Sequence, residues 1–161
     1  ASNISPDRLI ESFVLAEKNG LPQYQVLQPH YNLIERSKYE NEYASIVDKY
    51  DLGVLPYWSL AAGFLTGKYR SVDDLGKSVR GEGVKQYLNK RGFHILSALD
   101  EVSAKHNSKP ATVALAWLLA QPHVAAPIAS ATSLSQLETL FTAPQLDLDA
   151  QDLSILNNAG R

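Results

Sequence analysis

Two side-chain amides and one aromatic ring stand where short segments that are predicted to be strands end. Asn3 closes the first segment, Gln28 the second and Tyr57 the third. A carboxamide has hydrogen-bond donors and an acceptor, so two that converge match the reciprocal groups of another carboxamide. An aromatic face beside them supports a planar ring by stacking. Together they indicate a site for a planar ligand with an amide, whereas each side chain alone is also typical of loop capping or a core rim.

A stretch of small residues follows the third apolar segment. Residues 59–68 read SLAAGFLTGK and supply hydroxyls, backbone N–H groups and the cation of Lys68. Small side chains let the backbone approach a pyrophosphate closely, and an ammonium neutralises its charge. The stretch is not a P-loop, because Gly63 and Gly67 stand too close together and Tyr69 follows Lys68.

Hydroxyl side chains gather again after a fourth apolar segment. Ser130, Thr132 and Ser133 lead into a predicted helix that contains Gln136. Hydroxyls at a helix N-terminus either cap the helix or bind a phosphate, and both interpretations stay open here.

The sequence contains no pattern typical of a metal site, a catalytic triad or a disulfide. The four histidines are far apart and lack metal-ligand spacing, so we predict no zinc or iron site and interpret His30 as a structural residue. No Ser-His-Asp arrangement stands out. The chain has no cysteine, which excludes disulfides and thiolate chemistry.

The elements that must position these side chains alternate between strand and helix. Ser5-Pro6-Asp7 begins a helix that ends at Asn19-Gly20. Strands are predicted at Ala1–Asn3, 24–28, 52–57 and 124–130, further helices at 38–50, 92–105, 110–119, 133–141 and 149–157, and a long loop with short helical turns at 59–91. This order indicates βαβ units and a parallel sheet, which brings Gln28, Tyr57 and Ser130 to one edge.

In combination and order, these motifs resemble the C-terminal half of an aldo-keto reductase. They are Ser2-Asn3, QPHYN at 28–32, Tyr57 with GFLTGKY at 63–69, and SATS at 130–133 with Gln136-Leu137. The resemblance covers the whole chain and is greatest to bacterial members and the related potassium-channel beta subunits. It implies an α/β fold, the C-terminal half of a (β/α)₈ TIM barrel, over residues 1–161, with the N-terminal half absent.

The resemblance also implies a cofactor, NADP(H), and a role for each residue. Ser2, Asn3 and Gln28 would hold the nicotinamide carboxamide, and Tyr57 would stack on its ring. Along the pyrophosphate would lie Leu60, Gly63 and Lys68, with Arg80 as a second phosphate contact. At the adenosine ribose and its 2′-phosphate would lie Ser130, Thr132, Ser133 and Gln136.

Some positions depart from the family pattern. Trp58 and Ser59 stand where many members have a small hydroxyl residue and a proline. The cation near the 2′-phosphate and the Glu-Asn pair of many members are missing, so NAD(H) stays an alternative cofactor. The family's catalytic Asp, Tyr, Lys and His lie on the first four barrel strands and have no counterpart here, so we assign no catalytic residue.

Three functional hypotheses follow from this comparison. The leading one is the cofactor-binding half of an NADPH-dependent oxidoreductase, which transfers hydride to a small carbonyl substrate only in the intact protein. A nucleotide-sensing regulatory module and an inactive half-barrel fragment are the alternatives. Because unpaired sheet edges invite association, we expect the missing N-terminal half or a second copy to cover them.

The composition of the chain limits which other kinds of partner we expect. The net charge is −2, which predicts no binding to nucleic acid or to an anionic membrane surface. No apolar run approaches the roughly 20 residues of a membrane-spanning helix. The lack of cysteine is compatible with the cytosol, and we expect a cytoplasmic protein.

Overall fold

A short parallel sheet carries the residues of interest in the computed structural model, which describes residues 1–161. Strand β1 (Val26–Leu27) pairs in parallel with β2 (Gly53–Val54), with Val26 opposite Gly53. Single parallel bridges add Ser2 beside Gln28 on one side and Val124 beside Val54 on the other. The four segments therefore lie in chain order, and the predicted parallel arrangement is confirmed.

The strands themselves are shorter than predicted. Of 24–28 and 52–57, two residues each form a ladder, and Gln28 and Tyr57 lie in isolated bridges. The prediction of a strand at 124–130 is wrong, because only Val124 forms a bridge. Pro127 has no N–H to donate, and no segment pairs with the outer side of this stretch. A hydrogen bond of 2.8 Å from Ile128 N to Pro56 O still joins this stretch to the segment that follows β2.

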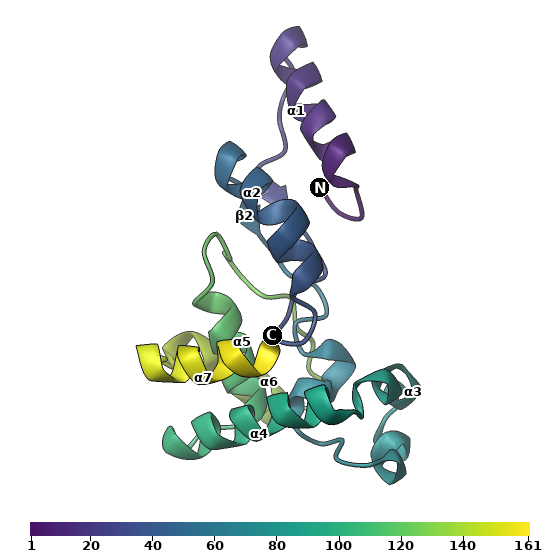
Figure 1. Ribbon diagram of the computed structural model, residues 1–161, viewed down its shortest axis with the longest axis vertical. Coiled ribbons are helices and arrows are strands. Elements are labelled where there is room, and N and C mark those ends of the chain that lie inside the picture. The colour runs from purple at the N-terminus through teal and green to yellow at the C-terminus, as the bar shows by residue number, and fades with distance from the viewer.

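Helix α1 (Pro6–Asn19) begins and ends where the sequence predicts. The Ser5 side chain accepts a hydrogen bond from Arg8 N, and Gly20 ends the helix in the left-handed conformation at φ 62°. Leu9 and Phe13 are buried, and the Phe13 ring stacks on Tyr50 with 4.0 Å between centroids. Helix α1 lies at one end of the molecule, above α2 and the sheet (Figure 1).

The helix predicted at 38–50 has two parts. Its first turn, η1 (Tyr39–Tyr43), is a π-helix, and α2 (Ala44–Tyr50) continues it as an α-helix. The Tyr43 hydroxyl donates to Ile4 O at 2.7 Å, which fixes this turn against the start of α1. π-Helical turns are rare and frequently occur at functional sites.

The long connection at 59–91 consists of short turns, as predicted. Their bounds are η2 (Ala61–Thr66), η3 (Val72–Lys77), α3 (Gly81–Val84) and η4 (Lys85–Tyr87). Phe64, Leu65 and Tyr69 are fully buried, so this connection packs into the core.

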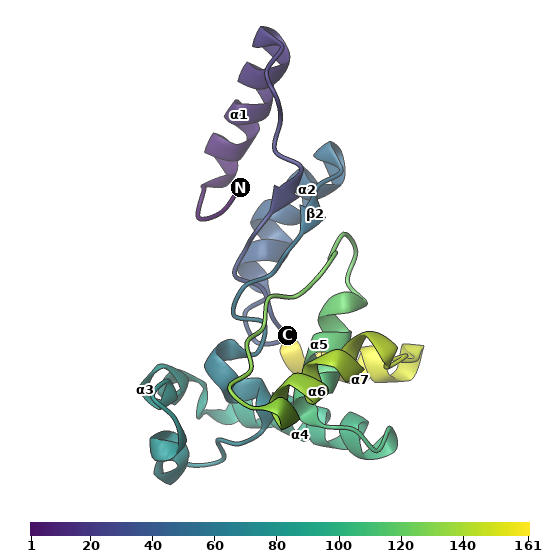
Figure 2. The same ribbon diagram turned by 180° about the vertical axis from the view of Figure 1, so that it is seen from behind.

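The remaining helices gather at the opposite end of the molecule from α1 (Figures 1 and 2). They are α4 (Lys90–Lys105), α5 (Pro110–Leu119), α6 (Leu134–Thr142) with η5 (Ala143–Gln145), and α7 (Ala150–Gly160). Helix α5 is buried along most of its length and packs against α4 and α6. The predicted helices at 92–105, 110–119, 133–141 and 149–157 are thus confirmed with small shifts of their ends.

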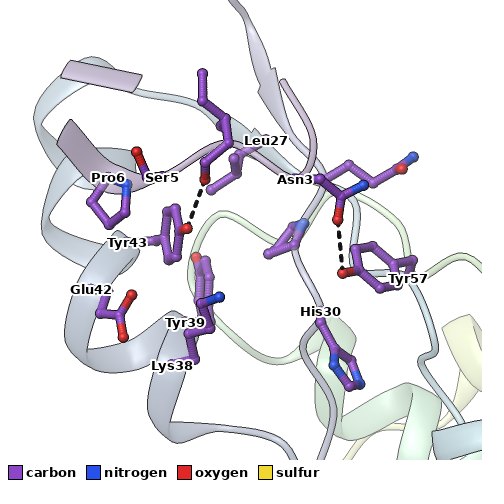
Figure 3. A pocket seen from close by; sticks show the side chains of 13 residues that line it. Asn3, Ser5, Pro6, Leu27, His30, Lys38, Tyr39, Glu42, Tyr43 and Tyr57 are labelled. Carbon is purple, nitrogen blue, oxygen red and sulfur yellow. Dashed lines mark hydrogen bonds between the residues drawn. The ribbon is translucent and has the colours of Figure 1, made fainter. Parts of the chain in front are cut away.

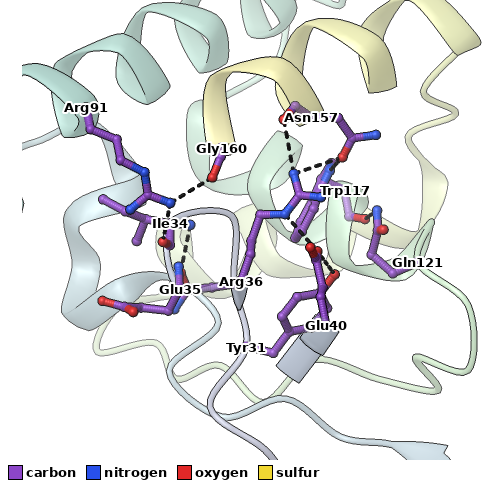
Figure 4. A network of polar contacts seen from close by, with 11 residues as sticks. Tyr31, Ile34, Glu35, Arg36, Glu40, Arg91, Trp117, Gln121, Asn157 and Gly160 are labelled. Atoms are coloured by element: carbon purple, nitrogen blue, oxygen red, sulfur yellow. Dashed lines mark hydrogen bonds and ion pairs between the residues drawn. The ribbon is translucent and has the colours of Figure 1, made fainter. Parts of the chain in front are cut away.

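Two arginines anchor α7 to the loop that follows β1 (Figure 4). Arg36 Nη1 donates to the backbone and side-chain oxygens of Asn157 at 3.2 and 3.1 Å, and its guanidinium lies over the Trp117 ring. Arg91 Nη2 donates to Ile34 O and Gly160 O at 2.8 and 2.7 Å. The loop is therefore held from its far end. No helix in the chain has the length and apolarity needed to cross a membrane.

Candidate nucleotide site at the strand ends

The structure brings four predicted site residues together at the ends of three parallel segments, and Figure 3 shows two of them, Asn3 and Tyr57. The Tyr57 hydroxyl donates to Asn3 Oδ1 at 3.2 Å. Ser2 Oγ donates to Gln28 at its Oε1, 3.3 Å away, and lies 3.1 Å from its backbone oxygen. Asn3 Nδ2 donates to Ser2 Oγ at 3.3 Å. These contacts hold two amides and one aromatic ring side by side.

A pocket of about 390 Å³ adjoins this group. Asn3, Gln28 and Tyr57 line it together with the first residues of α1 and part of the turn at 38–43. The sequence does not predict the contribution of that turn, because its π-helical geometry has no simple residue signature.

His30 belongs to the pocket wall, which the sequence interpretation missed. Its ring stacks on Tyr57, with 5.4 Å between centroids and 16° between planes, because the two residues face each other in a parallel bridge. Burial lowers the pKa of His30; the Lys38 charge acts in the same direction and Glu35 opposes it. His30 is therefore mainly neutral at pH 7. Its position two residues after Gln28, on the same strand face, is the sequence signal that could have identified it.

A buried amide fixes the residue that follows Tyr57. Trp58 adopts φ 55°, a left-handed conformation that is unusual for a bulky side chain. Asn32 is fully buried, and its Nδ2 donates to Trp58 O at 2.9 Å. Asn32 Oδ1 accepts from the backbone N–H groups of Ile34 and Glu35. One side chain therefore ties the loop after β1 to the strained turn after β2.

The predicted pyrophosphate residues Leu60, Gly63 and Lys68 form a second group in and around η2. Leu60 O accepts from Gly63 N at 2.9 Å, and a Cβ on Gly63 would lie 3.4 Å from Lys68 Cε. Lys68 is exposed, and its ammonium lies 5.0 Å from the centre of the Tyr69 ring. Ala61, Ala62 and Gly63 all have positive φ. Lys68 thus reaches back over a tightly turned backbone.

Arg80 does not join this group through any side-chain bond. It is exposed and precedes α3, and its backbone N–H donates to Ser78 Oγ at 3.3 Å. The nearest connection to the group runs through Ser78, whose hydroxyl lies 2.6 Å from that of Tyr69.

A third group lies at the N-terminus of α6. Ser133 Oγ accepts from Gln136 N at 3.3 Å, and Gln136 Oε1 accepts from Thr132 N at 2.9 Å. These bonds are helix capping, while Ser130 is exposed and free of side-chain bonds. Ser59 Oγ donates to Ile128 O at 2.9 Å, which links the segment before Ser130 to the start of the η2 region. No bond connects this third group with Asn3, Gln28 or Tyr57.

The donor set suits an uncharged amide ligand better than a metal ion. No three His, Asp or Glu side chains lie together as metal ligands would. Gln28 Nε2 forms no hydrogen bond within the chain, although Gln28 Oε1 does. A free amide N–H pair beside the Asn3 amide and the Tyr57 ring fits a planar carboxamide.

Known proteins share this chain's sequence pattern. It is 30% identical to Protein tas of Escherichia coli over 87% of the chain and 41% of that protein. It is 29% identical to the uncharacterized oxidoreductase YrpG of Bacillus subtilis over 98% of the chain and 47% of that protein. It is also 29% identical to the "Probable voltage-gated potassium channel subunit beta" of Oryza sativa, over 84% and 43%. The chain therefore spans somewhat under half the length of these relatives.

A solved structure shares the fold. A thermostable aldo-keto reductase, crystallised with the inhibitor epalrestat, superposes with a TM-score of 0.68 and 21% identity over 99% of this chain and 47% of that one. The parallel order of the strand segments thus corresponds to a partial α/β barrel. The model of the Aldo/keto reductase family matches residues 2–161, so the chain belongs to this family of oxidoreductases.

Proposed function

We propose that this chain is the cofactor-binding half of a cytoplasmic, NADPH-dependent aldo-keto reductase, which reduces a small carbonyl compound to an alcohol. The observation that carries the proposal is the convergence of Asn3, Gln28 and Tyr57 from three neighbouring segments. Ligand sites of parallel α/β folds lie at the carboxyl ends of the strands, which is where these residues stand.

Each member of the group has a chemical task in this proposal. Gln28, Asn3 and Ser2 would hold the nicotinamide carboxamide, Gln28 through its free Nε2 donor and Asn3 and Ser2 through their oxygens. The Tyr57 ring supports the nicotinamide face, and His30 stacks against Tyr57 and limits its rotation. Bound there in its reduced form, the cofactor would supply a hydride to the carbonyl carbon.

The phosphates lie along the other two groups in this proposal. Lys68 and the turned backbone at Leu60 and Gly63 approach the pyrophosphate, and Arg80 is a further phosphate contact. The N-terminus of α6 faces the adenosine ribose and its 2′-phosphate through four residues: Ser130, Thr132, Ser133 and Gln136. Hydroxyls at a helix N-terminus suit a phosphate group, which favours NADPH over NADH.

Reduction of a carbonyl also needs a proton donor, which we place on a second part of the enzyme. That part would pair with the free edges beside Ala1–Asn3 and 124–128, where no segment of this chain bonds. Both edges expose backbone donors and acceptors, and pairing them removes their tendency to associate nonspecifically. A second copy of this chain is the other candidate for the same edges.

Titration of the chain with NADPH and NADH in a calorimeter tests this function. We expect NADPH to bind, and Gln28→Ala to weaken binding about tenfold, because one buried hydrogen bond is worth about 1 kcal/mol or somewhat more. Gln86→Ala is the matched control, since Gln86 is an exposed amide that bonds within its own turn. Absence of NADPH binding, or equal affinity of the two variants, contradicts the proposal, and tighter binding of NADH corrects the cofactor.

A further inference from the structure

The turn at 38–43 gives the pocket polar groups that the nicotinamide does not use. Lys38, Tyr39, Glu42 and Tyr43 form the wall opposite Asn3 and Tyr57 (Figure 3). Three of these four side chains have no hydrogen-bond or ionic partner in the chain, and only Tyr43 is engaged, through Ile4 O.

Tyr39 is the most informative of them. The residue is 5% exposed and its ring packs on Tyr31, with 4.4 Å between centroids, yet its hydroxyl has no hydrogen-bond partner in the chain. Figure 3 shows this hydroxyl turned into the pocket. Burial, aided by the charge of Glu40, raises the pKa of Tyr39 to about 12. The group is therefore a protonated donor at neutral pH, and since the chain has no buried side-chain oxygen or nitrogen without a partner, this hydroxyl is accessible from the pocket.

Lys38 adds a positive charge beside this donor. Its ammonium is unpaired, and it lies close enough to His30 to lower the pKa of that ring after the larger effect of burial. A neutral hydroxyl donor and an unpaired ammonium that line one pocket can together bind a carboxylate, because hydrogen bonds to an ionised group are the stronger ones. The pocket volume of about 390 Å³ is at the small end of ligand sites, which run from roughly 300 to 1,000 Å³.

We propose that Lys38 and Tyr39 bind the carboxylate of a small carbonyl substrate, whose carbonyl end then points toward Asn3 and Tyr57. As an account of substrate class, this rests on the proposed function. Glu42, on the same wall, limits the affinity for such an anion because it carries the opposite charge to Lys38. Loss of the Lys38 charge or the Tyr39 hydroxyl should therefore weaken carboxylate binding, whereas loss of the Glu42 charge should strengthen it. A purely structural role would not produce effects of opposite sign.

Binding of two isosteric aldehydes to the chain, with and without NADPH, tests the site. The probes are 4-formylbenzoate and its neutral counterpart 4-formylbenzamide, measured by calorimetry or ligand-detected NMR. We expect about tenfold preference for the benzoate. Lys38→Gln and Tyr39→Phe should each reduce that preference about threefold to tenfold, and Glu42→Gln should raise benzoate affinity about twofold.

Controls distinguish benzoate binding at this site from nonspecific charge effects and from cofactor binding. Lys85→Ala removes an exposed lysine outside the pocket and should leave the preference unchanged. The Lys38 effect should weaken with added salt, because the ammonium is exposed. Equal binding of both probes, or an unaltered preference in Tyr39→Phe, overturns the inference. If NADPH fails to bind while the benzoate preference persists, the site stands and the proposed reductase function is wrong.

Discussion

The side chain of Asn32 reaches the backbone carbonyl of Trp58, 26 residues away in sequence, at 2.9 Å. This bond spans the ends of β1 and β2 and accompanies the unusual φ of 55° at Trp58. Residues in strained conformations persist where their surroundings fix them, and such positions cluster at binding sites. The Trp58 ring also meets His30 edge-on, so the strained turn and the pocket wall are coupled.

Asn32→Ala should lower the free energy of unfolding by about 2–3 kcal/mol, measured by urea titration. The substitution leaves the buried N–H groups of Ile34 and Glu35 without their acceptor, and each unsatisfied group costs about 1–3 kcal/mol. Asn41→Ala, at an exposed position on η1, should change stability by less than about 0.5 kcal/mol. Equal stability of the two variants would show that Asn32 does not fix the loop.

The free energy of unfolding should fall as the pH drops below about 4, because the Asp152 carboxylate on α7 becomes protonated. Burial alone raises the pKa of this carboxyl, but hydrogen bonds from Lys105 and His106 outweigh burial and leave the pKa below its ordinary value. A carboxyl with a depressed folded-state pKa stabilises the fold above the unfolded value, near 3.9, and loses that contribution as pH falls through the folded pKa.

Urea midpoints between pH 2 and pH 7 measure this dependence. Asp152→Asn should lower stability by about 1–3 kcal/mol at pH 7 and flatten the acid side of the profile, because the titrating group is gone. Asp73→Asn, at an exposed position, should retain the wild-type profile. An unchanged profile in Asp152→Asn would assign the acid sensitivity to other carboxylates.

Alanine substitutions at two glycines of the short helix α3 should have different effects on the stability of the fold. A Cβ on Gly81 would lie 1.8 Å from Leu75 O, whereas one on Gly83 would meet nothing within 4 Å. Gly81→Ala should therefore destabilise the chain by about 1–3 kcal/mol. Gly83→Ala should be neutral or stabilise by up to about 1 kcal/mol, because alanine restricts the unfolded chain. Differential scanning calorimetry distinguishes the two.

Lys68→Ala should weaken NADPH binding about tenfold if the ammonium contacts a phosphate. A charge-assisted hydrogen bond is worth about 1.5–3 kcal/mol, and the exposure of Lys68 places the effect at the lower end. Lys77→Ala is an informative control, since that ammonium is engaged with Asp74 and Lys68 O. Calorimetry that gives the same affinity for wild type and Lys68→Ala would remove Lys68 from the proposed site.

The chain alone should not reduce 4-nitrobenzaldehyde with NADPH, even where the cofactor binds. The proposed site holds cofactor contacts and no proton donor, so turnover should require the partner half of the barrel. Absorbance of NADPH at 340 nm follows the reaction, and a full-length aldo-keto reductase is the positive control. Clear turnover by the purified chain would require a donor among its own residues.

The sequence predicted those features that depend on local chemistry. The cap at Ser5 and the stop at Gly20 were correct, because capping is decided within a few residues. The parallel order followed from alternating strands and helices. The convergence of Asn3, Gln28 and Tyr57 followed from the rule that strand ends share an edge.

Features that depend on distant partners were not predictable. The segment at 124–130 looks like a strand, but a strand needs a neighbour, and this one has a neighbour on one side only. The role of Asn32 is invisible in sequence, because its partner Trp58 is brought near by the sheet. The turn at Tyr39–Tyr43 reads as ordinary helix, and only tertiary contacts show that it is wider and forms a pocket wall.

The anchoring of the loop after β1 by α7 has a consequence during protein synthesis. Arg36 leaves the ribosome long before its partner Asn157, which is 121 residues further along the chain. Until α7 emerges, the Arg36 guanidinium lacks the two acceptors that Asn157 supplies. A chain that ends before α7 therefore lacks the bonds to Asn157 and Gly160 that hold this loop at its far end.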